Sequence, residues 1–241
     1  ACNKIAFSAP GEYYRKLKDT AVEMGVSLRY ETTVGAALPV LETITRCVCS
    51  GDEIHKVEAV LSGTLNYIFT NYRGGDFASV VRDAQEKGYT EPDPRLDLSG
   101  RDVLRKLIIL SREAGLPMEE EDIHLTPLLG PEFFEGSIDD FYARLENSPL
   151  DTITSLYAKA QAAGEKLRFV ASLTKDGSCE KGYRAEIGLV SVDSENPLFH
   201  LKENDNAAII TTDFYPSPLV IQGAGAGRRQ TASGILNDIL L

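Results

Sequence analysis

Cysteine and histidine are scarce in this sequence, and their scarcity excludes two common kinds of site. The four cysteines contain no Cys-x-x-Cys pair, so reduced, packing thiols are expected rather than a disulfide framework or a redox motif. The three histidines are too dispersed to form a zinc site by their own spacing.

Long apolar runs are also absent. No run approaches the ~18 residues of a membrane-spanning helix, and no charged, then apolar leader opens the chain. The formal charge of -11 comes from scattered Asp and Glu, which argues against nucleic acid or an anionic membrane as a partner. We therefore expect a cytoplasmic protein that binds neither.

Apolar periodicity predicts both helices and strands. The expected helices are at residues 11–25, from Pro39 to 48, at 62–72 with Ser62 or Thr64 as cap, at 77–88, from Ser99 or Asp102 onward, and as a pair at 137–163. The expected strands are at 27–31 and 55–62, two or three at 167–192 around a Lys-Asp-Gly-Ser hairpin turn, and one near 218–222, followed by a glycine loop and a helix. No repeat or linker appears, so the two halves of the chain are expected to interlock.

The stretch GYTEPDPRLDLSGRDVLRK, residues 88–106, gathers opposed charges at the start of one helix. Helical spacing puts Asp102 and Lys106 one turn apart on the same face. A solvated ion pair contributing a few tenths of a kcal/mol is one interpretation. The other is a site for a substrate with an ammonium group, since the EPDP segment cannot be helical and would hold Glu91 rigidly beside a proton-transferring lysine.

Three further motifs leave alternatives open. GAGAG at 223–227 fails the Gly-x-Gly-x-x-Gly fingerprint, because Arg228 or Gln230 occupies the third glycine position. It is either a tight turn or a loop whose N–H groups touch a phosphate or nicotinamide. The hydroxyls of SGTLNYIF cap a helix or bind a carboxylate, and the carbonyls of ETTVGAALP form a turn or bind a hard monovalent cation.

Five segments together resemble homoserine dehydrogenase: NKIAFS, ETTVGAALP, LSGTLNYIF, GYTEPDPRLDLSGRDVLRK and GAGAGRRQTASGILNDIL. The segments PEFFEGSIDDFYARL and GEKLRFVASL resemble the version that is fused behind aspartokinase. The resemblance implies an NAD- or NADP-dependent interconversion of L-homoserine and L-aspartate 4-semialdehyde, on the route to threonine, methionine and isoleucine. It also implies an α/β fold: an α+β substrate domain with a mixed sheet covered by helices, and remnants of a Rossmann-type nucleotide domain.

The resemblance also implies roles for individual residues. Lys106 would be the acid/base that protonates the aldehyde oxygen, with Asp102 binding substrate beside it and Glu91 holding the substrate's amino group. The other implied residues are Thr64, Tyr89 and Asp97 in the substrate pocket, Lys4, Gly88 and Gly227 near the cofactor, and Glu31, Val34, Ala36 and Leu38 around a sodium ion. Ala36 stands where the family often has glycine, so the backbone freedom of glycine is lost at the ion site.

The family's first βαβ unit, which binds the dinucleotide, has no counterpart in the sequence. We therefore expect residues 1–31 to be the end of the nucleotide domain, 32–218 the substrate, catalytic and dimerisation domain, and 219–241 a return to the nucleotide domain. Such a fragment is expected to expose apolar surface at 1–30 and 219–241, to pair as a homodimer and to turn over negligibly alone. The alternative is a non-catalytic amino-acid-binding or dimerisation module of a larger polypeptide.

Overall fold

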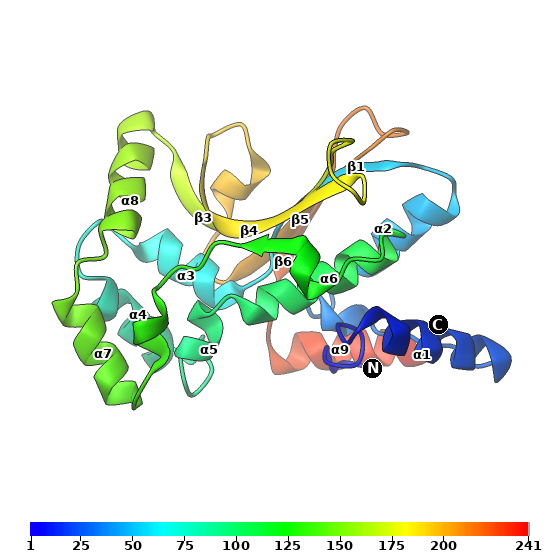
Figure 1. Ribbon diagram of the computed structural model, residues 1–241, viewed down its shortest axis with the longest axis horizontal. Coiled ribbons are helices and arrows are strands. Elements are labelled where there is room, and N and C mark those ends of the chain that lie inside the picture. The colour runs from blue at the N-terminus through cyan, green and yellow to red at the C-terminus, as the bar shows by residue number, and fades with distance from the viewer. Residues whose placement is uncertain (241) are drawn as a thin grey trace.

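The computed structural model describes residues 1–240 as helices around one mixed sheet (Figure 1). The strands are β1 (Ile54–Val60), β2 (Ile123–Leu125), β3 (Lys166–Lys175), β4 (Tyr183–Val192), β5 (Asp205–Thr212) and β6 (Leu219–Ala224). The longer helices are α1 (Gly11–Glu23), α2 (Val40–Cys49), α3 (Gly63–Asn71), α4 (Phe77–Glu86), α6 (Arg101–Glu113), α7 (Ile138–Asn147), α8 (Asp151–Ala163) and α9 (Arg228–Leu240), and α5 (Arg95–Leu98) is a single turn.

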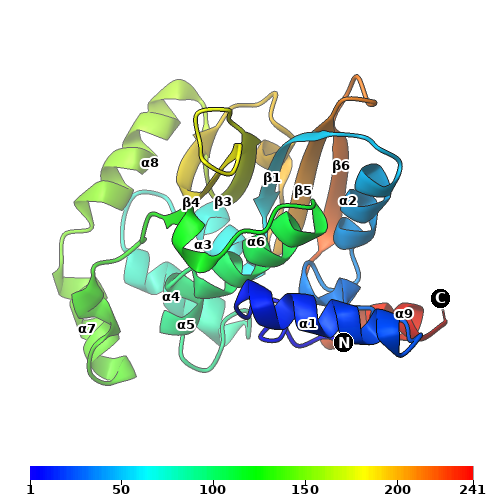
Figure 2. The ribbon, with the colours of Figure 1, turned by 45° about the vertical axis from the view of Figure 1, so that its right-hand side comes forward.

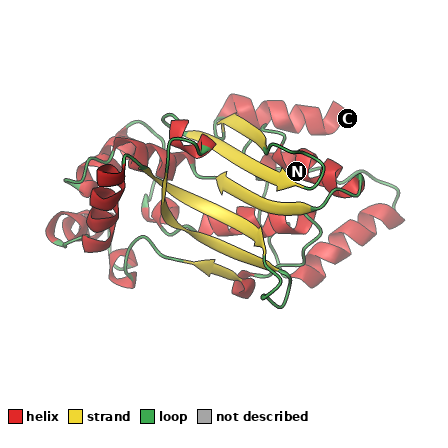
Figure 3. Cartoon of the chain, turned by 90° about the horizontal axis from the view of Figure 1, so that it is seen from above, coloured by secondary structure: helices red, strands yellow, loops and turns green. Residues whose placement is uncertain are grey.

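The sheet has the order β2-β4-β3-β1-β5-β6, and its strands lie side by side in Figure 3. Only β2 runs parallel to its neighbour, β4, and every other pairing is antiparallel. The sheet is therefore mixed, and the expected α/β fold class with helices covering a mixed sheet is confirmed.

The two faces of the sheet are covered unequally. Along β5, Ala208 and Ile210 face the larger core, while Ala207 and Ile209 face a smaller one, as the two-residue period of a strand requires. Helices α2, α3, α6 and α8 contact the strands, and α3 and α6 lie against the face of the larger core in Figures 1 and 2. The smaller core is closed mainly by the short 3-10 helix Pro197–His200. One face is thus deeply buried and the other is only partly covered.

Most of the expected elements are present. Helix α1 ends just before Gly25, which has a φ of 62°, and Ser62 caps α3 by accepting a hydrogen bond from the Leu65 N–H at 3.2 Å. The hairpin of β3 and β4 closes at Asp176, whose N–H donates to the Gly182 carbonyl at 2.8 Å. The glycine loop expected at 223–227 begins inside β6, which includes Gly223 and Ala224, and residues 225–227 separate β6 from α9.

The strand expected at residues 27–31 is wrong. Residues 26–30 have no regular structure, and a 3-10 turn covers Glu31–Thr33. A strand is stabilised by its partner's hydrogen bonds, and no strand of the described residues lies alongside this segment.

Both ends of the described chain expose apolar side chains. Val22 and Met24 of α1 are 80% and 71% exposed, and Ile239 of α9 is 73% exposed. The two helices lie at the same end of the molecule in Figures 1 and 2. The predicted apolar surface is therefore confirmed at 1–30 and, for the described residues, at 219–240; Leu241 lies outside the described residues. Among residues 1–240, no helix has the length and apolar character to cross a membrane.

Candidate active site

Helix α6 presents the predicted charged pair at the edge of its buried face. Val103, Leu104 and Leu107 are at most 4% exposed, and Asp102 and Lys106 lie beside this buried stripe, with side chains 40% and 11% exposed. The helix starts after Gly100, not at the predicted Ser99 or Asp102 caps, and Gly100 has a φ of 70°. Glycine suits this position because of its left-handed backbone, and because a Cβ there would lie 3.2 Å from Leu125 and Phe169.

Lys106, Asp102 and Lys4 form one ionic cluster. The Lys106 Nζ lies 2.8 Å from Asp102 Oδ2 and donates to the Leu61 carbonyl at 2.6 Å. The Lys4 Nζ lies 3.2 Å from Asp102 Oδ1. Burial alone would raise the pKa of Asp102, but the charges of Lys106 and Lys4 hold it below its ordinary value. The carboxylate is therefore ionised at neutral pH and keeps both ammonium groups in place.

Asp97 ties the start of α3 to the loop before α5. Its Oδ1 accepts from the Thr64 hydroxyl at 2.9 Å, and its Oδ2 accepts from the Glu91 N–H at 2.9 Å. Burial raises the pKa of Asp97, against the lowering effect of these two donors. Both oxygens are engaged, so Asp97 acts by positioning Thr64 and the backbone of Glu91.

The loop between α4 and α5 is partly open to solvent. The Thr64 Oγ1 also lies 2.5 Å from the Tyr89 carbonyl oxygen and shares its one O–H between that carbonyl and Asp97. The Tyr89 ring packs on Tyr67 with ring centroids 4.8 Å apart. Glu91 is exposed, and within residues 1–240 its carboxylate has neither an ion pair nor a hydrogen bond. Gly88 is exposed too, with a φ of 71° and open space where a side chain would lie. The loop thus offers a free carboxylate next to an open surface.

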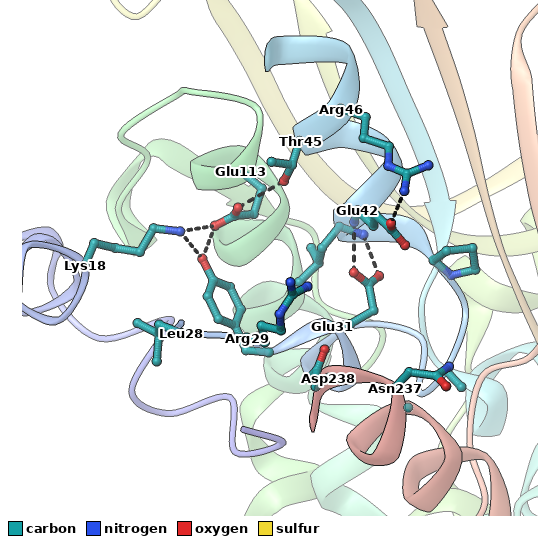
Figure 4. A pocket seen from close by; sticks show the side chains of 15 residues that line it. Lys18, Leu28, Arg29, Glu31, Glu42, Thr45, Arg46, Glu113, Asn237 and Asp238 are labelled. Carbon is teal, nitrogen blue, oxygen red and sulfur yellow. Dashed lines mark hydrogen bonds and ion pairs between the residues drawn. The ribbon is translucent and has the colours of Figure 1, made fainter. Parts of the chain in front are cut away.

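The Glu31 side chain is a helix cap. Its two oxygens accept from the N–H groups of Leu41 and Glu42, both at 2.8 Å, at the start of α2 (Figure 4). Burial, the largest influence, raises the pKa of Glu31 to about 7, although the two N–H donors act in the opposite direction. A cation at this loop would therefore meet main-chain carbonyls and not this carboxylate.

The backbone of the expected cation loop keeps a left-handed turn without the second glycine. Gly35 has a φ of 77° and Ala36 a φ of 56°, so alanine adopts the conformation that glycine would favour. The Val34 and Ala36 carbonyls accept no hydrogen bond from the described residues, whereas those of Glu31 and Leu38 each accept one backbone N–H. Two of the four carbonyls are therefore open to a further partner.

A cavity of about 300 Å³ lies between α1, α2 and α9, away from Lys106. Figure 4 shows Lys18 and Glu113 on one wall, and Glu31 and Asp238 on others. The Lys18 Nζ lies 3.5 Å from Glu113 Oε1. Of the residues proposed from the sequence, only Glu31 lines this cavity, so the Lys106 cluster lies elsewhere, where α6 meets the end of β1.

Sequence reasoning missed two contacts, one at Lys106 and one at the glycine loop. The Leu61 carbonyl at the end of β1 binds the Lys106 ammonium, and Asn206 of β5 lies against Gly225 of the glycine loop. The sequence around these residues does not indicate either contact, because each contact joins two segments that are separated along the chain. The proposed cofactor residue Gly227 lies two residues beyond Gly225, with a φ of 130°.

Comparison with known proteins gives the family. The family model for homoserine dehydrogenase matches residues 39–240. The bifunctional aspartokinase/homoserine dehydrogenase of Haemophilus influenzae is 41% identical over 99% of this chain and 29% of its own length. The homoserine dehydrogenase of Schizosaccharomyces pombe is 38% identical over 99% of this chain and 64% of its own length.

A solved structure agrees in fold. The crystal structure of the putative homoserine dehydrogenase of Archaeoglobus fulgidus superposes with a TM-score of 0.78 at 27% identity, over 99% of this chain and 64% of the other. The chain thus spans less than two thirds of each of these proteins while matching them along almost its whole length. It belongs to the homoserine dehydrogenase family.

Proposed function

We propose that this chain is the substrate-binding and catalytic part of an enzyme that interconverts L-homoserine and L-aspartate 4-semialdehyde with NAD or NADP, in the synthesis of threonine, methionine and isoleucine. The observation that carries the proposal is the Lys106 ammonium, held 2.8 Å from Asp102 at the edge of the buried face of α6 on a side chain that is 11% exposed. Family membership supplies the reaction class.

Lys106 is the proposed acid/base. Asp102 and the Leu61 carbonyl occupy two of its N–H groups, and the third has no acceptor among residues 1–240. That group donates a proton to the aldehyde oxygen as the aldehyde is reduced, and it takes the proton back from the hydroxyl in the reverse direction. Asp102 stabilises the ammonium form and orients it.

The substrate's amino group is proposed to bind Glu91, whose exposed carboxylate has no partner among the described side chains. Asp97 accepts hydrogen bonds from the Glu91 N–H and the Thr64 hydroxyl and so holds them together. The Tyr89 carbonyl also contacts the Thr64 hydroxyl, which places Tyr89 in the same group. An amino acid that reaches from Glu91 to Lys106 would thus be fixed at both ends.

Three residues of this chain suit the nicotinamide end of an NAD or NADP molecule. When bound, the reduced cofactor supplies the hydride. Lys4 lies beside Asp102, Gly88 leaves open space where a side chain would stand, and the loop at Gly227 follows β6. We propose that these residues border the nicotinamide end, and that a βαβ unit outside this sequence binds the pyrophosphate.

The proposed domain boundaries follow from this division. Residues 1–31 and 219–241 are proposed to pack on the nucleotide-binding unit, and 32–218 to form the substrate domain, although β6 itself pairs with β5 in the same sheet. A monovalent cation such as sodium is proposed at the carbonyls of Glu31, Val34, Ala36 and Leu38. The partly covered sheet face is proposed to pair with a second copy of the chain.

The test measures homoserine-dependent reduction of NAD and NADP by the natural polypeptide that carries residues 1–241. Lys106→Met is expected to lower kcat by about 100-fold to 10,000-fold, the range for a lost general acid. Lys175→Met is the matched control, because it also removes an ion pair, at 2.6 Å from Glu53, on the end of β3. A folded wild-type protein that binds homoserine without turnover would favour the non-catalytic binding module.

A further inference from the structure

Asn206, at the start of β5, is buried without hydrogen-bond partners. It is 1% exposed, and neither its Nδ2 nor its Oδ1 has a partner among the described residues. An unsatisfied buried polar group costs roughly 1–3 kcal/mol. Such groups are uncommon in folded proteins, and each has a cause such as local strain, a bound water or ion, or a role in function.

The register of the sheet puts Asn206 next to the anchor of Lys106. Strands β1 and β5 are antiparallel, and Val60 pairs with Ala207, so the next residues, Leu61 and Asn206, are neighbours. The Leu61 carbonyl accepts from the Lys106 Nζ at 2.6 Å. Asn206 also shares the face of Ala208 and Ile210, which is the face covered by helices.

The glycine loop lies directly on the Asn206 side chain. A Cβ added at Gly225 would collide with the Cβ, Cγ and Nδ2 atoms of Asn206. Ala226 and Gly227 of the same loop are exposed, and Gly227 has a φ of 130°. The amide is therefore separated from solvent by a short, glycine-rich segment whose backbone has wide conformational freedom.

We propose that Asn206 is a cofactor-binding residue of the enzyme, an inference that depends on the proposed function. When the glycine loop shifts, the amide pairs with the carboxamide of the nicotinamide ring. A carboxamide is the complementary group, because it offers one acceptor to Nδ2–H and one donor to Oδ1. The ring is then held next to the strand end that anchors Lys106.

Asn66 of α3 provides a matched control. It is also fully buried and its Oδ1 likewise lacks a partner among the described residues, but its Nδ2 donates to the carbonyls of Glu203 at 3.0 Å and Asp205 at 3.1 Å. Those bonds hold the turn before β5 against α3, which is a structural role. Asn66→Leu leaves these carbonyls without their donor, so the melting temperature is expected to fall.

The experiment compares the wild type, Asn206→Leu and Asn66→Leu in the natural polypeptide. Leucine keeps the branched arrangement of heavy atoms of asparagine, with bulkier methyl groups, and removes a buried amide that lacks partners, so Asn206→Leu is expected to melt near the wild-type temperature. Dissociation constants are measured for the oxidised dinucleotide and for its analogue in which an acetyl group replaces the carboxamide. The wild type is expected to prefer the carboxamide about tenfold, and Asn206→Leu to bind both alike.

The results distinguish a failure of the proposed role of Asn206 from a failure of the proposed function. A preference for the carboxamide that survives in Asn206→Leu overturns the role of Asn206 and leaves the proposed function intact. A wild type that binds neither dinucleotide overturns the cofactor in the proposed function, and this role with it. If Asn206→Leu does not fold, Asn206→Ala is measured in the same way, and an unchanged preference in that variant also overturns the role.

Discussion

The Lys106 ammonium is oriented by acceptors from two different elements. Asp102 stands one turn earlier on the same helix, so helix geometry alone brings it close. The Leu61 carbonyl, at the end of β1 and 45 positions away in sequence, binds the same Nζ at 2.6 Å. The helix supplies the ion pair, and the sheet decides where the ammonium points.

Glu91→Gln tests the proposed amino-group contact. The substitution keeps the size of the side chain and removes its charge, so the KM for homoserine is expected to rise about 10-fold to 100-fold, the value of a hydrogen bond between charged groups. Steady-state kinetics measure it in the natural polypeptide. Glu86→Gln, on the exposed end of α4, is the control and should leave KM unchanged. Equal KM values in wild type and Glu91→Gln would place the amino group elsewhere.

The left-handed backbone of Gly35 and Ala36 affects the stability of the fold. Gly35→Ala is expected to lower the free energy of unfolding by about 1–2 kcal/mol, because its φ of 77° disfavours a side chain. Ala36→Gly should stay within about 1 kcal/mol of wild type. The relieved strain is offset by the lost buried methyl group and the freer unfolded chain. Urea denaturation measures both, and a stabilising Gly35→Ala would contradict the argument.

At the scale of elements, α2 begins without a capping side chain of its own. Pro39 occupies the N-cap position and makes no side-chain hydrogen bond. The Glu31 carboxylate, eight or more positions earlier, accepts the N–H groups of Leu41 and Glu42 instead. The same residue that opens the proposed cation loop therefore stabilises the next helix, which couples the loop to α2.

This cap makes stability depend on pH. The pKa of Glu31 is raised by burial from 4.5 to about 7, so between these values the folded state holds a proton that the unfolded state has lost. The stabilising contribution is complete below pH ~4.5 and is lost as pH rises through ~7. The difference in unfolding free energy between wild type and Glu31→Gln should therefore fall over that range, as measured by urea titration. A difference that grows with pH would mean that the two N–H donors outweigh burial.

At the scale of the whole molecule, the partly covered sheet face carries exposed valines. Val190 of β4 and Val220 of β6 are 43% and 48% exposed. Val190 pairs with Arg168 and Val220 with Ile209. Ile209 belongs to the smaller core, and the Arg168 guanidinium donates to the carbonyls of Leu198 and Leu201 in that core. Exposed apolar side chains on a broad sheet suit a self-complementary interface.

Light scattering is expected to give twice the chain mass of 26.3 kDa. The double variant Val190→Lys, Val220→Lys should give the single mass, because charges on both valines would be buried against each other. Val48→Lys changes a valine of α2 that is 38% exposed and serves as the control. A wild-type monomer would exclude this interface.

Local rules accounted for much of the fold. Apolar periodicity and capping residues predicted α1, α3 and the β3–β4 hairpin, because helix and turn geometry depend on residues a few positions apart. The same reasoning failed at residues 27–31, where alternating apolar residues suggested a strand. A strand forms only beside another strand, and that partner is not visible in local sequence.

The sequence by itself determined that Asp102 and Lys106 share a helix face, that no complete dinucleotide fingerprint is present, and which family the chain resembles. All three depend on residue types and on their spacing over short stretches of the chain, which can be read from the sequence without knowing which distant segments are in contact. Only the tertiary structure decided that Lys4 contacts Asp102 and that the Leu61 carbonyl binds Lys106. It also decided that Glu31 caps α2 and that Asn206 lies buried beneath Gly225. Those contacts depend on sheet register and on helices packing across it, and no periodicity of the sequence encodes which distant segments come together.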